Sequence, residues 1–302
     1  MVRFMDTDEI KPDISGWKRI SDHYMKGKLS GSPKMSVIIP SYNQGHTLEA
    51  TIQSFIEQKN VDKELIIIDC GSQDHTLSLL EKYKAYISRI YYVARKNYPL
   101  MVNKGFALAT GEYVSYLLPG VQYLNQHCLC HMSQVAFENR SPEVLFSGSY
   151  ITEATFPTIK ESLHKSTDDI EPFFHYYPFN KSWLKRGFIP SAPCSIWYKS
   201  EYIAKINGLR YDTASLKKTI FDLLCRIYQD KNVRAASTFW STTSHDRRMQ
   251  KRILNYKDYF TYFSVVAKYF GIVSAVLWFF RHKPTRIFAG LITKLRTFFK
   301  ES

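Results

Sequence analysis

The chain has 302 residues, 45% of them apolar, and a formal net charge of +14. This size and apolar content exclude an intrinsically disordered protein and suffice for one large domain with a small appendage. The charge is concentrated, since residues 247–302 carry twelve Lys and Arg residues against Asp258 and Glu301, a net charge of +10. A nucleic-acid-binding protein would carry its basic residues on the folded body, so we expect no nucleic acid as a partner.

The amino-terminal residues and the cysteines indicate the compartment. Residues 1–34 are polar, lack a continuous apolar run and end in a cluster of Gly, Ser and Pro, so we expect a leader there and no secretory signal. The cysteines are odd in number and have no disulfide-framework spacing: Cys70, Cys128, Cys130, Cys194 and Cys225. Such usage is typical of a reducing, cytoplasmic compartment.

Regular structure is expected from Met35. Residues 36–40 (SVIIP) predict a short apolar strand that ends at a proline, and a turn follows. The apolar residues of 48–56 share one helical face. In ELIIID (residues 64–69), four consecutive bulky apolar residues are typical of a strand buried on both faces of a parallel sheet.

Asp69 falls at the carboxyl end of that second strand, and Gly71 supplies the tight turn after it. Ligands bind at this edge of open α/β sheets, which favours a ligand role for Asp69. Any strand-to-helix junction also uses a glycine and a capping side chain, here Ser72 or Asp74. On spacing alone, both interpretations stay open.

Strands and helices continue to alternate through the middle of the chain. We expect strands at 89–94, 112–118, near 144–156 and at 233–240, and helices at 77–83, 101–109, 124–137, 195–206 and 215–228. This alternation predicts an α/β fold, a mostly parallel Rossmann-like sheet with helices on both faces, over residues 35–246.

Residues 247–302 form a basic, aromatic tail that we expect to be helical. Between Tyr259 and Phe280 the only charged residue is Lys268, and basic residues follow at once. This pattern favours a helix lying on an anionic membrane surface, which places the protein peripherally on the cytoplasmic face. A span is disfavoured because Lys268 near its centre would cost roughly 2.5 to 3.5 kcal/mol. The alternative is a helical appendage packed on the body.

The sequence HCLCH at residues 127–131 places His127, Cys130 and His131 on one helical face. A structural zinc site normally draws its ligands from two separated pairs. We therefore interpret the cluster as helix packing and predict no metal site.

Three segments of the chain resemble the family 2 glycosyltransferases, which have the nucleotide-sugar-binding A-type fold. They are SVIIPSYNQGHTLEATIQS, ELIIIDCGSQDHT and NKGFALATGEYVSYL, and they cover residues 35–123, with a weaker similarity over 189–244. The resemblance implies transfer of a sugar from a nucleotide diphosphate donor to a saccharide or lipid-linked acceptor, as in polysaccharide or lipopolysaccharide biosynthesis.

The resemblance also implies a set of residues that bind the nucleotide sugar. The first loop would frame the base, the aspartate of the second segment would meet base or ribose, and the lysine of the third could meet phosphate. With the arginine after the third strand, the set is Pro40, Tyr42, Asn43, Asp69, Gly71, Asn103, Lys104 and Arg95.

The chain departs from the family where chemistry is expected. The family holds a divalent cation with an Asp pair, but residues 118–121 are Leu-Pro-Gly-Val and offer no oxygen ligand from a side chain. Ile220 stands in the place of the usual base, with Asp222 nearby. Two hypotheses follow. In one, Arg95 or Lys104 replaces the metal and Asp222 deprotonates the acceptor. In the other, the protein is an inactive homologue, a binding or scaffolding partner at the membrane.

Overall fold

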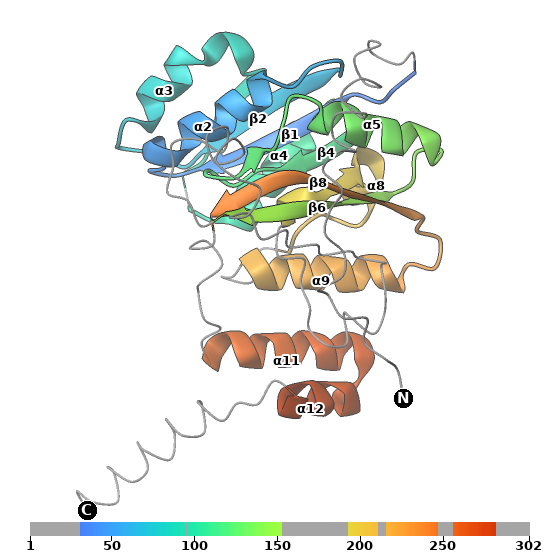
Figure 1. Cartoon of the computed structure of the whole chain (residues 1–302). Coiled ribbons are helices and arrows are strands. Elements are labelled where there is room, and N and C mark those ends of the chain that lie inside the picture. Colours follow the sequence, from blue (N-terminus) through green and yellow to red (C-terminus); the bar gives the residue numbers. More distant parts are fainter. Residues whose placement is uncertain (1–30, 95, 153–192, 211–215, 247–255, 282–302) are drawn as a thin grey trace, which may run out of the picture.

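The computed structural model describes residues 31–94, 96–152, 193–210, 216–246 and 256–281. Eight strands form one sheet in the order β3-β2-β1-β4-β7-β6-β8-β5 (Figure 1). The strands are β1 (Met35–Ser41), β2 (Lys63–Asp69), β3 (Arg89–Tyr92), β4 (Tyr113–Tyr116), β5 (Gln122–Tyr123), β6 (Val144–Thr152), β7 (Ile196–Lys199) and β8 (Ala235–Asp246). The helices are α2 (Gly45–Ile56), α3 (Thr76–Lys82), α4 (Tyr98–Leu108), α5 (Cys128–Glu138), α8 (Ser200–Lys205), α9 (Leu216–Gln229), α11 (Tyr256–Phe270) and α12 (Ile272–Arg281).

The first half of the sheet is parallel. β1 pairs with β2 and β4, and β2 pairs with β3, all in the same direction. All seven residues of β1 and six of the seven in β2 are buried, which explains their apolar composition. Gly105 of α4 allows the helix to approach β1, because a Cβ there would lie 2.4 Å from Cγ2 of Ile38. This half confirms the predicted strand and helix alternation.

The second half of the sheet is mixed. β7 runs antiparallel to both β4 and β6, β6 and β8 are parallel, and β5 is antiparallel to β8. The predicted helix at 195–206 is wrong in its first half, since Ile196–Lys199 is strand β7 and only Ser200–Lys205 is helical. Ile196, Trp197 and Tyr198 are buried in the sheet, where branched and aromatic side chains pack well.

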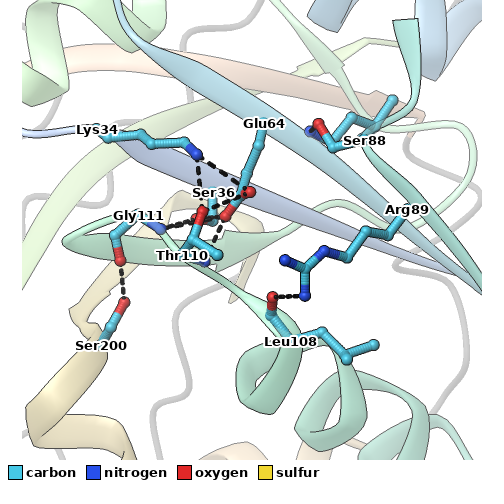
Figure 2. A network of polar contacts seen from close by, with 10 residues as sticks. Lys34, Ser36, Glu64, Ser88, Arg89, Leu108, Thr110, Gly111 and Ser200 are labelled. Carbon is cyan, nitrogen blue, oxygen red and sulfur yellow. Dashed lines mark hydrogen bonds and ion pairs between the residues drawn. The ribbon is translucent and has the colours of Figure 1, made fainter. Parts of the chain in front are cut away.

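Glu64, at the start of β2, fastens the amino ends of the strands together (Figure 2). Its carboxylate accepts hydrogen bonds from the hydroxyl of Ser36 at 2.6 Å, the amide of Gly111 at 3.1 Å, the hydroxyl of Thr110 at 2.8 Å and the ammonium of Lys34 at 3.3 Å. Burial acts to raise the pKa of Glu64, but these hydrogen bonds outweigh it and lower the pKa to about 2. The network aligns β1, β2 and the turn before β4.

Helices lie on both sides of the sheet, with α2, α3 and α5 above it in Figure 1 and α9 below. Helices α9, α11 and α12 are stacked in that order away from the sheet. The tail is thus helical where it is described, and α11 and α12 meet at Gly271. In the described ranges, no helix has both the length and the apolar character needed to cross a membrane. The leader as far as residue 30 and the segments 153–192 and 282–302 lie outside the described residues.

Candidate functional site

The candidate site lies at the carboxyl edge of the parallel strands. β1 ends at Ser41 and β2 ends at Asp69, and these two residues are partners in the sheet. Asp69 is in turn the partner of Tyr92 at the end of β3. The loops after the three strands therefore leave the sheet side by side. Pro40, inside β1, is buried beside Ile68 and fixes the point where the first loop begins.

Asp69 joins the first two loops through Ser72. The Asp69 carboxylate accepts the backbone amide of Ser72 at 2.8 Å and its hydroxyl at 2.5 Å. The Ser72 hydroxyl accepts the amide of Asn43 at 2.9 Å, and the Asn43 side-chain oxygen accepts the amide of Gln73 at 2.7 Å. The two loops are thereby locked to each other. Asp69 itself has an exposed fraction of 0% and supports the loop surface from beneath.

The backbone at the edge is bent sharply in both loops. Asn43 has a φ of 51°, a left-handed conformation that asparagine tolerates, and Gly71 has a φ of 68°. Gly71 is exposed, and a Cβ built on it would have no neighbour within 4 Å. The turn predicted for Gly71 is present, and the space beside it is open.

Asp74, the alternative cap, connects two helices. Its carboxylate accepts the amide of Gly45 at 3.0 Å, at the start of α2, and the amide of Thr76 at 3.0 Å, at the start of α3. Burial acts to raise the pKa of Asp74, but these hydrogen bonds lower it on balance. Of the two caps considered, Asp74 holds the helix and Ser72 serves Asp69.

Lys96 is the cation that the structure places at this edge, and the sequence did not single it out. Its ammonium lies 4.3 Å from the centre of the Tyr42 ring, and its side chain is exposed. Burial and then the charge of Asp69 raise the pKa of the Cys70 thiol, while Lys96 acts to lower it, so Lys96 is electrostatically close to the Asp69 turn. The sequence offered one signal for Lys96, since it directly follows Arg95, which had been predicted to bind the donor. Arg95 itself lies outside the described residues.

Asn103 and Lys104 are engaged elsewhere. The Asn103 side-chain oxygen accepts the amide of Leu209 at 2.8 Å, and its amide donates to the Leu209 carbonyl, so Asn103 ties α4 to the loop before α9. The Lys104 ammonium lies 4.3 Å from the centre of the Tyr91 ring, on β3. The structure therefore gathers Pro40, Tyr42, Asn43, Asp69 and Gly71, whereas the contacts of Asn103 and Lys104 are structural.

Asp222 lies in α9 within a cluster of cations. Its carboxylate is 3.0 Å from Nε of Arg226, 3.4 Å from Nη1 of Arg210 and 3.8 Å from Nζ of Lys268. It also accepts the hydroxyl of Tyr269 at 2.8 Å. Lys268 and Tyr269 belong to α11, so Asp222 fastens the tail to the body. Arg226 completes the cluster by donating to the carbonyls of Ile206 and Gly208.

The residues at the expected metal position do not fit a divalent cation. Leu118-Pro119-Gly120-Val121 follows β4 as a largely buried turn, and its side chains carry no oxygen. Across the described part of the chain, no group of three His, Cys, Asp or Glu residues could hold a metal ion. In the HCLCH segment, His131 is hydrogen-bonded to Thr238 at 2.7 Å, and burial lowers the pKa of His131 to about 4.

Comparison with known proteins adds sequence relatives. Residues 36–117 match the sequence model described as Glycosyl transferase family 2. The chain is 44% identical over 85 residues to the cholesterol galactosyltransferase of Borreliella burgdorferi, a match covering 28% of this chain and 24% of that protein. It is 32% identical over 136 residues to the poly(ribitol-phosphate) beta-N-acetylglucosaminyltransferase TarP of Staphylococcus aureus, covering 43% and 40%. The matches thus span well under half of these relatives.

Solved structures extend the similarity to the whole sheet. The crystal structure of S. aureus TarS 1-349 aligns with a TM-score of 0.61 at 14% identity, covering 83% of this chain and 73% of that one. The same protein in complex with UDP-GlcNAc aligns with a TM-score of 0.59 at 15% identity, covering 78% and 66%. The shared feature is the A-type fold, including the mixed half of the sheet.

Proposed function

We propose that this chain, whose residues 36–117 form a family 2 glycosyltransferase segment on an A-type fold, transfers a sugar from a nucleoside diphosphate to a saccharide or lipid-linked acceptor. Its relatives include enzymes named for a sterol, a poly(ribitol-phosphate) and an undecaprenol-linked saccharide acceptor. Polysaccharide or lipopolysaccharide biosynthesis is the matching process. The whole reaction is a proposal, because the matches cover only part of each relative.

The observation that carries the proposal is the pairing of Tyr42 and Lys96 beside the Asp69 turn. An aromatic ring can stack on a base, and a lysine ammonium can meet a diphosphate. Both side chains stand at the carboxyl edge of parallel strands, where nucleotides bind in open α/β sheets. The open space at Gly71 lies in the same loop pair as the buried Asp69. In this arrangement Asp69 positions the loops, and a nucleotide would lie on the surface that they form.

We also assign to Lys96 the role of stabilising the negative charge of the leaving diphosphate. In the transfer, an acceptor oxygen forms a bond to the anomeric carbon while the bond from that carbon to the phosphate oxygen breaks. The nucleoside diphosphate leaves with the electron pair, and the acceptor proton passes to a base. Lys96, with Arg95 next to it in the sequence, would stabilise the departing charge. Lys104 is a weaker candidate, because its ammonium lies against Tyr91.

Asp222 was the predicted base, and this role stays a prediction. Its carboxylate is paired with Arg226, Arg210 and Lys268 and accepts the hydroxyl of Tyr269, contacts that attach α11 to the body. The same observation supports a second candidate function. The protein would then be a catalytically inactive homologue that binds nucleotide sugars and acts as a binding or scaffolding partner at the membrane.

Calorimetric titration separates these proposals. We expect the protein to bind one of a panel of nucleoside diphosphates, including UDP and GDP, in the presence of EDTA. Asp69→Asn should weaken that binding at least tenfold, about 1.4 kcal/mol, because it releases the Ser72 hydroxyl that joins the two loops. Asp62→Asn, an exposed aspartate before β2, should bind normally. Absence of binding, or equal binding by Asp69→Asn, would overturn the site.

Turnover then decides between enzyme and inactive homologue. Release of the nucleoside diphosphate from a panel of nucleotide sugars, with and without Mn²⁺, supports the transferase. The inactive homologue is supported if the protein binds nucleotide sugars but, with and without Mn²⁺, neither releases the nucleoside diphosphate nor transfers the sugar to lipid-linked saccharides.

We also propose the division of the chain into a leader (1–34), a transferase body (35–246) and a tail (247–302). The tail would hold the body peripherally at the cytoplasmic face of a membrane. Its support is the net charge of +10 in residues 247–302 and the helical form of α11 and α12.

A further inference from the structure

The outermost helix, α12, presents an apolar face that the described structure leaves uncovered. Ile272 is 60% exposed, Val273 70%, Val276 39% and Leu277 66%. Their spacing places all four on one side of the helix. Ala275, which points the other way, is fully buried, since α12 packs on α11. These four residues are called the α12 face below.

The position of the α12 face makes it a docking surface rather than part of the core. α12 is the outermost helix of the stack α9, α11 and α12, so its uncovered face lies outside the core (Figure 1). α12 runs from Ile272 to Arg281, where the described part of the tail ends, and among the described residues no helix is long and apolar enough to cross a membrane.

The charges in the tail sequence indicate which partner fits the α12 face. From Tyr259 to Lys300 the sequence has no Asp or Glu, and it carries seven cations: Lys268, Arg281, Lys283, Arg286, Lys294, Arg296 and Lys300. A second copy would bring two sets of cations together, whereas an anionic lipid surface would neutralise them.

We infer that the α12 face inserts into the interface of an anionic lipid bilayer, and that the net positive charge of the tail sequence attracts it to the headgroups. The inference rests on the proposed membrane placement of the tail, names the surface that does the binding, and does not depend on nucleotide chemistry. α11 makes the contact rigid, because Lys268 and Tyr269 connect it to Asp222 in the body. The bound enzyme would therefore have one fixed orientation on the membrane.

Vesicle sedimentation of the full chain tests the inference. The protein should bind vesicles that contain phosphatidylglycerol and bind pure phosphatidylcholine at least tenfold more weakly. The double variant Val273→Ser and Leu277→Ser should bind the anionic vesicles at least tenfold more weakly, since both side chains lose their apolar groups. Leu77→Ser, at an exposed leucine of α3, is the matched control and should bind within twofold of the unaltered protein. Nucleotide binding should be unchanged in all variants, so the two proposals fail separately.

Equal binding of the double variant and the unaltered protein to anionic vesicles would overturn the inference. It would also be overturned if sedimentation velocity showed the unaltered protein as a dimer and the double variant as a monomer. A label at Val273→Cys tests whether the chain covers its own face. All five native cysteines are buried, so the new thiol should react selectively with an environment-sensitive dye. A water-like emission that shifts to the blue with anionic vesicles supports the inference. An apolar emission before vesicles are added would show that another part of the chain occupies the face.

Discussion

Asp69 and Asp222 are both buried carboxylates, with exposed fractions of 0% and 7%, and their surroundings differ completely. Asp69 accepts its hydrogen bonds from Ser72, a neutral residue, at the edge where three parallel strands end. Asp222 is paired with two arginines and a lysine in the helical layer beneath the sheet. The first arrangement shapes two loops, and the second attaches a helix.

This difference shows that burial of an acid does not by itself identify a chemical role. A carboxylate held by neutral donors keeps its charge available to the electrostatics of its site, as at Asp69, where it raises the pKa of Cys70. A carboxylate surrounded by cations forms ion pairs that hold structural elements together. The comparison supports the proposed ligand site at the strand ends and assigns tail attachment to Asp222 of α9.

The largest effect is expected for Asp222→Asn. Removing the acid leaves Arg226, Arg210 and Lys268 around an uncharged side chain, so the free energy of unfolding should fall by about 3 kcal/mol. Urea denaturation followed by circular dichroism measures the change. Tyr269→Phe is the matched control, which loses one hydrogen bond and should cost about 1 kcal/mol. A stable Asp222→Asn protein that has lost only turnover would instead assign the acid to catalysis.

Glu64 supplies a third buried carboxylate, at the opposite end of the strands from Asp69. Its pKa is lowered from 4.5 to about 2 in the folded state, so its contribution is complete above pH 4.5 and is lost as the pH falls from 4.5 towards 2. The contribution is on the order of 2 to 3 kcal/mol. Unfolding measured at pH 6 and at pH 3 should show this loss in the unaltered protein.

Glu64→Gln should be less stable at pH 6 and should show a smaller loss between pH 6 and pH 3. Glu81→Gln, at an exposed surface pair with Lys84, should follow the unaltered protein at both values. An unchanged acid sensitivity in Glu64→Gln would mean that other carboxylates govern it.

The smallest effect is expected for Lys96→Gln. The substitution removes the exposed ammonium above the Tyr42 ring, so the affinity for UDP should fall about fivefold, close to 1 kcal/mol, while the affinity for uridine stays the same. Lys82→Gln, an exposed lysine of α3, is the control. If the affinities for UDP and uridine fell equally, Lys96 would not contact the diphosphate.

The sequence predicted the parallel half of the sheet because its signals are local. Consecutive apolar residues in β1 and β2, the glycine turn at Gly71 and the NKG run each depend on neighbours within a few residues. β7 was predicted as helix because Ile196–Lys199 is short and acquires its pairing from Val114 and Val144, both far away in the sequence. Long-range pairing of this kind leaves no local pattern.

The candidate site was predictable in part for the same reason. The first loop and the Asp69 turn come together because two adjacent parallel strands end there, which the sequence pattern indicates. The positions of Lys96 and of the cations around Asp222 could not be predicted in this way. They depend on side-chain directions and on the packing of α11 against α9. Arg226 is four residues from Asp222 and could have been paired with it by helical spacing, whereas Tyr269 and Lys268 could not.

β4 lies where the sheet changes character, and this has a consequence for how the two halves respond to substitution. It pairs in parallel with β1 and antiparallel with β7 through Tyr113 with Lys199 and Val114 with Tyr198. The match to the family model ends at residue 117, directly after β4. The two halves are also joined by side chains, since the Ser115 hydroxyl donates to the carbonyl of Ile196 at 2.7 Å and Asn103 is bonded to Leu209, so a change in the second half reaches the parallel half through β4 and α4. A substitution at Ser115 or Asn103 should therefore affect both halves of the sheet.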